Sequence, residues 1–516
     1  MLPWLRERYT SLDRLNDAWC TTFWSHRFTD WAQVVVPSAL SEHWRGPDHT
    51  AFQGITLDYL RFTSDNLLRT FREEKAAIRR HSDLPVTTNF MGMYRPVDYH
   101  RWADDLDFAS WDNYPPDDRS AARMALAHDL MRGLKGGQPF WLMEQTPSVT
   151  ASRDVNPVKR PGVLRLWSWQ AVAHGADAVL YFQMRQSRGA CEKYHGAVVG
   201  HAGRTDTRVF REVAALGAEL EQVGGELLGG RTPSRVALLF DWDSWWAVEI
   251  SDGPNRHVKY PHVVTAYYAA LWECGAQVDV VPVTADLAGY DVVVAPLLHM
   301  VAGDVAARLE AVAARGGTVL TTVLSGRVDV DDVAFAADVP GPLAGLVGVR
   351  VDETDARAPG VTNAVTLALP GRDVVVSDAS LVFDLVQPTA AEVLGTYGTD
   401  FYAGTAAVTR NRHGDGEAWY VGTLLDAAGV GAVVRAVLDR HGLVGPYADV
   451  PGLELATRRT ARADVDLLLH HGDQVVEVPA HADATDLISG RRITAGEVLR
   501  LAPTDVLVLR RETGTG

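Results

Sequence analysis

Hydrophobic residues in the first 200 positions form two kinds of pattern that alternate along the chain. Between Ala51 and Arg80 they recur at helical spacing, which predicts one long amphipathic helix. Short continuous apolar runs follow, and stretches with helical spacing separate them. The predicted strands are residues 84–89, 106–112, 140–144 and 178–184, with predicted helices over 121–134 and 164–174. This alternation is typical of a parallel α/β barrel.

The number of predicted strands limits what this part of the chain can build. A (β/α)8 barrel closes with about eight strands, whereas the pattern predicts strands only at the positions given above. We therefore expect residues 1–214 to form the C-terminal half of a (β/α)8 TIM barrel, with the N-terminal half absent from this chain.

A second α/β pattern begins after the turn at residues 229–233. Buried strands are predicted at 235–241, 278–283, 291–296 and 316–320, with helices at 258–274 and 301–315 between them. This order predicts a doubly wound α/β domain over residues 215–445. The stretch from the end of the 316–320 strand to Arg410 is expected to be mainly loop. A strand at 419–421 and a helix at 430–441 then complete the domain.

The last part of the chain has the pattern of an all-β domain. Short apolar strands separated by polar turns run from Gly452 to Arg511. They predict a small antiparallel β-sandwich over residues 446–516. A domain this small is marginal alone, so we expect it to be docked against the rest of the chain.

The composition is that of a globular protein, and the net charge limits the kinds of partner that the chain is expected to bind. The chain has 516 residues, an apolar content of 47% and a net charge of −16. So acidic a chain is not expected to bind nucleic acid or an anionic membrane surface. No apolar run reaches the roughly 20 residues that span a bilayer, and the first residues do not form a signal peptide. We therefore expect a cytoplasmic protein.

Cysteine and histidine spacing gives no sign of a metal site. The cysteines are far apart in the sequence, at Cys20, Cys191 and Cys274, and no two histidines have metal-ligand spacing. No nucleotide-binding or zinc-protease motif occurs either. We expect no metal and no cofactor.

Polar and aromatic residues follow three successive predicted strands. Glu144 ends the apolar run 140–143, and TIM barrels carry their chemistry at the C-terminal ends of their strands. Asp112 and Tyr114 lie at the end of the preceding strand, and residues 183–185 (Gln-Met-Arg) lie at the end of the next one. Aromatic faces beside charged groups suit a sugar, whose hydroxyls Asp112 would hold. The alternative for Glu144 is a helix cap or an arginine partner.

Longer stretches around these residues resemble the glycoside hydrolase family 42 β-galactosidases. They are residues 141–148 (Trp-Leu-Met-Glu-Gln-Thr-Pro-Ser), 159–162 (Lys-Arg-Pro-Gly) and 183–198, which contain Glu-Lys-Tyr-His-Gly. Residues 4–9 and the order of the later domains extend the similarity along nearly the whole chain. The resemblance implies a retaining glycosidase that acts on galactosides. It also implies an α/β trimerisation domain, a small C-terminal β domain and a homotrimer.

The resemblance further implies roles for individual residues. Glu144 matches the nucleophile, and Glu192 and His195 match galactose-contacting residues. Tyr114 matches a tyrosine after the sixth strand, and Trp24 a tryptophan at the site entrance. The alternatives are an ordinary surface helix start for Glu192 and His195, a core-edge position for Tyr114 and a structural role for Trp24.

Two departures from the family pattern lower the activity that we expect of this chain. The family's acid/base glutamate belongs to an Asn-Glu pair that should precede Trp4, and Ser152 stands where the family has a tryptophan. We therefore expect a β-galactosidase with impaired activity in this chain. The alternatives are a non-catalytic oligomerisation or sugar-binding protein, or an enzyme that prefers L-arabinopyranose. A tryptophan cluster at Trp242, Trp245 and Trp246 suggests a second sugar surface, but the resemblance implies that it borders a neighbouring subunit.

Overall fold

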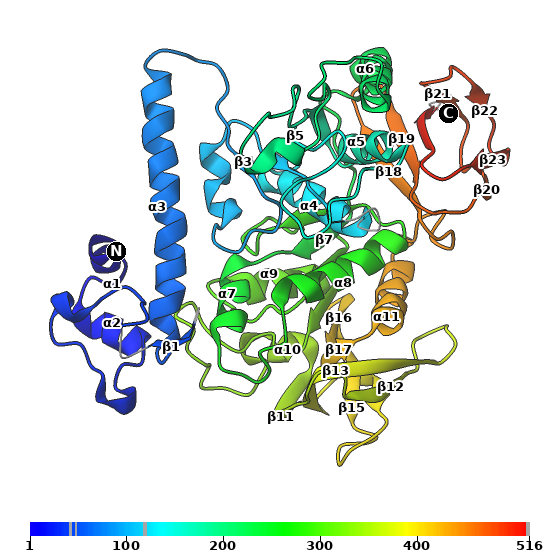
Figure 1. Ribbon diagram of the computed structural model, residues 1–516. Helices are drawn as coiled ribbons and strands as arrows, with labels where there is room; N and C mark the ends of the chain where they lie inside the picture. Colours follow the sequence, from blue (N-terminus) through cyan, green and yellow to red (C-terminus); the bar gives the residue numbers. More distant parts are fainter. Residues whose placement is uncertain (41–43, 47–48, 117–120, 512–516) are drawn as a thin grey trace.

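The computed structural model describes residues 1–40, 44–46, 49–116 and 121–511. Its N-terminal segment packs against one long helix, α3, at the edge of the molecule (Figure 1). Asp58 of α3 accepts hydrogen bonds from the Tyr9 hydroxyl at 2.6 Å and the Trp19 indole at 2.9 Å, which fix the segment in place. The elements are α1 (Leu2–Tyr9), α2 (Leu12–Ala18), η1 (Phe23–Ser25), η2 (Trp31–Gln33), β1 (Trp44–Gly46), β2 (His49–Thr50) and α3 (Gln53–Arg79).

The next part is a parallel sheet whose strands pair in chain order, β3-β4-β5-β6. Phe140 and Leu142 are fully buried, whereas Trp141 between them is 38% exposed, so one face of β5 lies against the core. The elements are β3 (Asn89–Phe90), η3 (Tyr99–Asp105), β4 (Ser110–Asp112), α4 (Ala121–Leu134), β5 (Phe140–Glu144), α5 (Val163–Ala173), β6 (Ala176–Val179), η4 (Cys191–Tyr194) and α6 (Arg208–Leu227). The predicted half-barrel is confirmed.

Three of these strands are shorter than predicted: β6 ends at Val179 instead of residue 184, and in β3 and β4 side chains replace part of the ladder. The Asp107 carboxylate accepts from the Val86 backbone N–H at 2.5 Å, and the Thr87 hydroxyl donates to the Phe108 carbonyl at 2.6 Å. Regular pairing between β3 and β4 therefore starts only at Asn89. Apolar periodicity does not show where a side chain takes over a backbone partner.

The middle part is a doubly wound α/β domain, as predicted. Its parallel strands lie in the order β16-β10-β9-β7-β8, with helices on both faces (Figure 1). Val236 and Leu238 of β7 pack in the core that contains α8 and α11, whereas Ala237 and Leu239 pack in the core of α9. The elements are β7 (Val236–Leu239), α7 (Trp242–Ile250), α8 (Tyr260–Glu273), β8 (Val278–Val281), β9 (Val292–Ala295), α9 (Val305–Ala314), β10 (Thr318–Thr322), β16 (Gly416–Val421) and α11 (Ala427–Arg440).

The stretch before Arg410 is not mainly loop, and that expectation is wrong. It adds antiparallel strands to the same sheet, which project from the body of the molecule (Figure 1). Asp384 is buried within them and accepts hydrogen bonds from Tyr420 at 2.5 Å and Arg327 at 2.7 Å. The elements are η5 (Gly341–Leu343), α10 (Ala344–Val347), β11 (Val349–Ala356), β12 (Thr362–Leu367), β13 (Val375–Pro388), β14 (Glu392–Tyr397), β15 (Ala406–His413) and β17 (Thr423–Leu425).

The tryptophan cluster of α7 lies inside this chain, which corrects the expectation that it borders another subunit. Trp242, Trp245 and Trp246 are each at most 4% exposed. Trp242 and Trp246 donate their indole N–H groups to backbone carbonyls of residues 94 and 95, at 3.1 and 2.7 Å. The cluster therefore joins the middle domain to the half-barrel.

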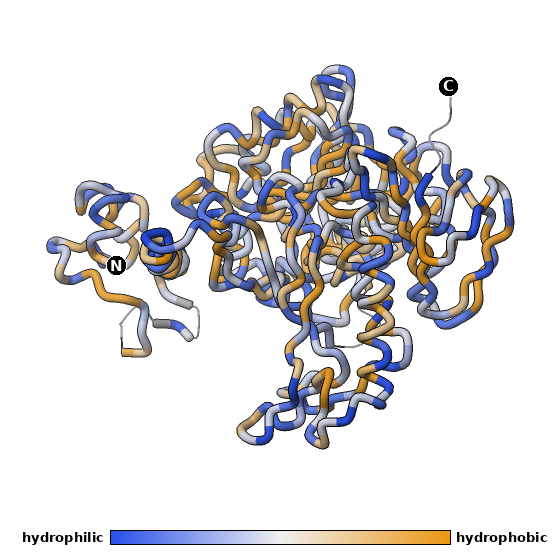
Figure 2. Tube along the Cα trace, turned by 90° about the horizontal axis from the view of Figure 1, so that it is seen from above, coloured by the Kyte–Doolittle hydropathy of each residue, from blue (hydrophilic) through white to orange (hydrophobic). Residues whose placement is uncertain are grey.

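The C-terminal domain is antiparallel throughout and docked, as predicted. Leu467, Leu469 and Val508 pack on Leu166 and Trp169 of α5. Viewed from above, this domain and the N-terminal segment lie at opposite ends of the molecule (Figure 2). The strands are β18 (Leu453–Arg459), β19 (Asp464–His470), β20 (Val476–Pro479), β21 (Ala484–Asp486), β22 (Arg492–Ile493), β23 (Val498–Leu501) and β24 (Val506–Arg511). Over the described residues, no helix has the length and apolar character needed to cross a membrane.

Candidate active site

The ends of β4 and β5 bring two of the expected site residues into direct contact. The Tyr114 hydroxyl donates a hydrogen bond to Glu144 Oε2 at 2.8 Å. The backbone supports this contact, because the N–H of Asn113 donates to the Glu144 carbonyl at 2.8 Å and Asp112 pairs with Glu144 in the sheet register. Burial and then the Glu144 carboxylate raise the pKa of Tyr114, so the phenol stays protonated as a donor.

Asp112 lies beside this pair and shares its charge environment. Its Oδ2 accepts a hydrogen bond from Asn89 Nδ2 at 2.5 Å, while its Oδ1 is buried and has no partner among the described residues. Burial and then the charge of Glu144 raise the pKa of Asp112 to about 7. A carboxyl group that titrates near neutrality can both donate to and accept from sugar hydroxyls.

Glu192 and His195 approach Tyr114 from the segment after β6. The His195 ring is 6% exposed and stands edge-on to Tyr114, with ring centroids 5.7 Å apart. Burial lowers the pKa of His195, although the charge of Glu192 opposes the shift, so the ring is neutral at pH 7. Its buried Nε2 has no hydrogen-bond partner in the described structure, which leaves it available to a ligand hydroxyl.

Trp24 is not brought to this cluster. It lies in η1 of the N-terminal segment, is 61% exposed and stacks on Phe23 with ring centroids 4.6 Å apart. Within the described residues no hydrogen bond or ring contact joins Trp24 to Glu144 or its neighbours. Ser152, at the position of the family tryptophan, has a positive φ of 78° and an exposed side chain.

Arg153 and Lys159 contact residues of the site, and the sequence analysis did not predict them as site residues. Arg153 donates to the backbone carbonyls of Tyr114 and, at 2.7 Å, Pro115. The buried Lys159 donates to the Thr146 carbonyl and lies 4.7 Å from the centroid of the Trp167 ring. Burial and then the charge of Arg153 lower the pKa of Lys159 to about 7. The feature of the sequence that could have indicated Lys159 is the Lys-Arg-Pro-Gly stretch at 159–162, in which a turn directly follows the lysine.

Gln145 is a further residue that the sequence did not single out. Its side chain is fully buried and donates to the Ser168 hydroxyl of α5 at 2.7 Å. The backbone carbonyl of Gln145 accepts a hydrogen bond from the backbone N–H of Phe182 at 3.0 Å. These bonds fix the backbone next to Glu144 between α5 and the chain that follows β6.

A cavity of about 370 Å³ opens beside the cluster, within the size range of small-molecule sites. Asp112, Tyr114 and Trp111 line it together with α4 residues, whereas Glu144 does not. In the described part of the chain, no group of three histidine, cysteine or acidic side chains is placed to hold a metal ion. The cluster itself presents carboxylates, a phenol and an imidazole.

Comparisons with known proteins identify the family. The profile described as β-galactosidase matches residues 2–223, the β-galactosidase trimerisation domain matches 234–444, and the β-galactosidase C-terminal domain matches 452–511. A β-galactosidase of Planococcus sp. (strain 'SOS Orange') is 44% identical over 504 residues, which are 96% of this chain and 74% of that protein.

Solved structures agree with the sequence comparison. The crystal structure of β-galactosidase from Bacillus circulans sp. alkalophilus superposes with a TM-score of 0.95 at 44% identity, covering 99% of this chain and 76% of that one. A β-galactosidase from the Antarctic haloarchaeon Halorubrum lacusprofundi gives a TM-score of 0.86 at 30% identity, with coverage of 99% and 75%. The chain thus spans about three quarters of the length of these relatives. It belongs to the glycoside hydrolase family 42 β-galactosidases.

Proposed function

We propose that this chain carries the nucleophile side of a retaining β-galactosidase site, which removes terminal β-D-galactose from galactosides. The observation that carries the proposal is the hydrogen bond between Tyr114 and Glu144 at the ends of neighbouring parallel strands. It holds one carboxylate oxygen of Glu144 in a fixed direction and leaves the other free to react. A positioned carboxylate at this edge of a barrel sheet is the arrangement that a glycosidase nucleophile needs.

In the proposed reaction, Glu144 attacks the anomeric carbon of the galactoside. The bond between that carbon and the glycosidic oxygen breaks, and the leaving group departs with the bonding electron pair and takes up a proton. A galactosyl ester of Glu144 results. Water then adds to the anomeric carbon and loses a proton, which releases galactose with retained configuration and restores the carboxylate.

Asp112, Glu192 and His195 bind the galactose hydroxyls in this proposal. Asp112 and His195 each present a buried polar atom without a partner in the described structure, at Oδ1 and Nε2. Glu192 acts electrostatically on both Tyr114 and His195, which places its charge close to the same space. Trp24 would line the entrance only in an arrangement that brings the N-terminal segment closer to Glu144.

No residue of this site is assigned as the donor of a proton to the leaving group. A retaining glycosidase needs a second carboxyl group about 5–5.5 Å from the nucleophile, across the glycosidic bond. Asp112 is engaged with Asn89 and lies on the neighbouring strand, so we assign it to hydroxyl binding. We therefore propose that residues 1–516 turn over galactosides poorly unless the leaving group needs no protonation. General acid catalysis typically contributes ~10²–10⁴-fold.

A comparison of two substrates tests the proposal. The chain is assayed with lactose and with a dinitrophenyl β-galactoside, whose phenolate leaves without protonation. We expect cleavage of the activated substrate only, and loss of that cleavage in Glu144→Gln but not in Glu73→Gln, which changes an exposed carboxylate of α3. Lactose hydrolysis at an ordinary enzymatic rate would contradict the assigned roles. Sugar binding without cleavage of either substrate would favour a binding protein instead.

The assembly proposed for the chain is a homotrimer that forms through the middle domain. Its support is the match of residues 234–444 to the family's trimerisation domain. Light scattering at micromolar concentration measures the mass directly, and a monomer would contradict the proposal.

A further inference from the structure

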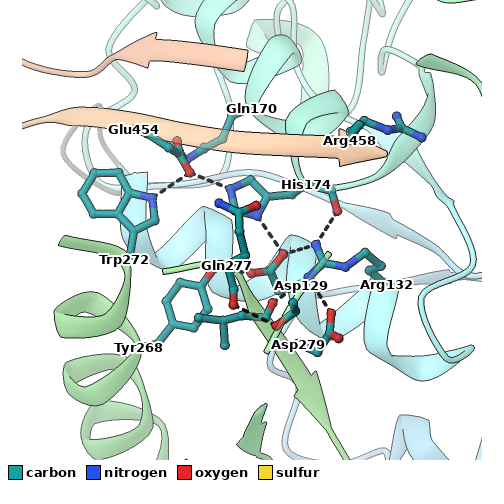
Figure 3. Close-up of polar contacts among 12 residues, drawn as sticks. Asp129, Arg132, Gln170, His174, Tyr268, Trp272, Gln277, Asp279, Glu454 and Arg458 are labelled. Carbon is teal, nitrogen blue, oxygen red and sulfur yellow. Dashed lines mark hydrogen bonds and ion pairs between the residues drawn. The ribbon is translucent and has the colours of Figure 1, made fainter. Parts of the chain in front are cut away.

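One buried ionic cluster lies where the three parts of the chain meet (Figure 3). His174, at the C-terminal end of α5, stands between two carboxylates. Its Nδ1 lies 2.7 Å from Asp129 Oδ1 of α4, and its Nε2 lies 2.6 Å from Glu454 Oε1 of β18. The proposed reaction does not use this cluster.

The geometry determines the charge of the His174 ring. An ionised carboxylate only accepts hydrogen bonds, and a neutral imidazole donates from one nitrogen only. The pKa values of Asp129 and Glu454 are both lowered, so both carboxyl groups are ionised. Each nitrogen of His174 faces one of their oxygens at hydrogen-bond distance, so both nitrogens donate and the ring is an imidazolium. Burial lowers the pKa of His174, but the charges of Asp129 and Glu454 outweigh burial and raise the pKa to about 9.

Glu454 of β18 connects the C-terminal domain with both the half-barrel and the middle domain. Besides His174, its oxygens accept from the Trp272 indole of α8 at 2.7 Å, from Gln170 of α5 at 3.0 Å and from His471 at 2.8 Å. All four contacts reach a carboxylate that is 5% exposed. Burial raises the pKa of Glu454, but the charge of His174 and the hydrogen bonds outweigh it and hold the pKa far below its usual range.

Asp129 closes the other side of the cluster. It accepts from the Tyr268 hydroxyl of α8 at 2.5 Å and pairs with Arg132, which also donates to Asp279 of β8 at 3.0 Å. His128 is the remaining titratable group of α4 nearby. Its ring centroid lies 6.0 Å from that of His174, and burial lowers its pKa to about 3, so it is neutral. Arg458 of β18 pairs instead with Asp177 at 2.7 Å.

We propose that the imidazolium of His174 is a pH-sensitive clasp, which fastens the C-terminal domain to the half-barrel and the middle domain and opens at alkaline pH. Loss of one ring proton leaves a buried carboxylate facing a nitrogen lone pair. Removing one partner of a buried ion pair in this way is strongly destabilising. The apolar contact of α5 with β19 and β24, which also docks this domain, does not change its charge with pH.

The direction of the pH dependence follows from linkage. His174 binds its proton more tightly in the folded chain than in the unfolded chain, so its contribution is complete below pH ~6.5. The contribution is lost as the pH rises through about 9. Glu454 stays ionised over this whole range, so the alkaline change arises from the imidazole.

Calorimetry of the full chain at pH 6, 8 and 10 tests the clasp, with His174→Gln and the matched control His128→Gln. Both substitutions replace a buried histidine of the same core, but only His174 contacts carboxylates. We expect His174→Gln to lower the unfolding midpoint by roughly 5 °C or more at pH 6. This gap should close by pH 10, whereas the gap for His128→Gln should not change between pH 8 and pH 10, because His128 is neutral in the folded and the unfolded chain above its unfolded pKa of ~6.5.

A constant gap for His174→Gln from pH 6 to pH 10 would overturn the proposal. A second measurement does not depend on any variant that folds poorly. In wild-type protein labelled with ¹⁵N-histidine, the ring nitrogens of a charged, doubly protonated imidazole have shifts distinct from those of a neutral ring. We expect the ring of His174, which is 8% exposed, to remain charged at pH 8. Spectra in which every histidine is neutral at pH 8 would exclude the clasp.

Discussion

Glu144 ends β5 and Tyr114 follows two residues after the end of the neighbouring strand β4, and the Tyr114 phenol donates a 2.8 Å hydrogen bond to the Glu144 carboxylate. The bond engages Oε2 and leaves Oε1 for a reacting carbon. Arg153 holds the backbone of Tyr114, and Gln145 anchors the backbone beside Glu144 to α5. The pair is thus fixed from both strands, which is the condition for a positioned nucleophile.

Removal of the phenol hydroxyl should slow the first chemical step. A hydrogen bond to a charged group contributes about 1.5–3 kcal/mol, so Tyr114→Phe should reduce the rate of galactosyl transfer to Glu144 by roughly 10–100-fold. Stopped-flow release of dinitrophenolate measures this rate. The control is Tyr59→Phe on α3. An unchanged rate in Tyr114→Phe would mean that the hydrogen bond does not position the nucleophile.

Asp112 should make the protein less stable as the pH rises from about 4 to 7. Its pKa is raised to about 7, so the folded chain binds a proton more tightly there than the unfolded chain does. Asp112→Asn removes this dependence and should raise the unfolding midpoint at pH 8, with little effect at pH 4. Thermal unfolding at both values measures the change, with Asp83→Asn, at an exposed position, as the control. Equal effects at pH 4 and 8 would contradict the burial of a charge at this position.

Lys159 should have the opposite dependence at higher pH. Its pKa is lowered to about 7, so the unfolded chain binds the proton more tightly and stability rises between about pH 7 and 10. Lys159→Met retains the buried stem and removes the titration. The free energy of unfolding of wild type minus that of Lys159→Met, from urea titrations, should therefore increase from pH 7 to 9.5. A difference that stays constant from pH 7 to 9.5 would rule the shift out, and Lys193→Met, at an exposed position, is the control variant.

The parts of the fold that sequence patterns predicted are those built on simple periodicity. The helix α3 and the strand β5 were predicted nearly to the residue, because one has a clear amphipathic period and the other a continuous apolar run. The antiparallel extension from β11 to β15 was missed. Its long strand β13 contains Ser377, Asp378 and Asp384, and polar residues within a strand obscure the alternation that identifies it.

The candidate site was predictable where residue type and strand end coincide, and not elsewhere. Asp112, Tyr114 and Glu144 meet because adjacent parallel strands end at the same edge of the sheet. Arg153 and Lys159 reach the site from a loop, and their contacts are with backbone carbonyls, which leave no trace in the sequence. The tryptophans of α7 show the reverse error: an aromatic cluster suggested a surface but fills an internal junction.

The central claim is that Glu144 is the nucleophile, and trapping of its galactosyl ester tests this most directly. The chain is incubated with 2,4-dinitrophenyl 2-deoxy-2-fluoro-β-galactoside, which forms the ester but hydrolyses slowly, and is then digested and analysed by mass spectrometry. We predict the added mass of one fluorogalactosyl group on the peptide that contains residues 140–147, and none in Glu144→Gln. The label on another carboxylate, Asp112 or Glu192 above all, with Glu144→Gln still labelled, would contradict the account.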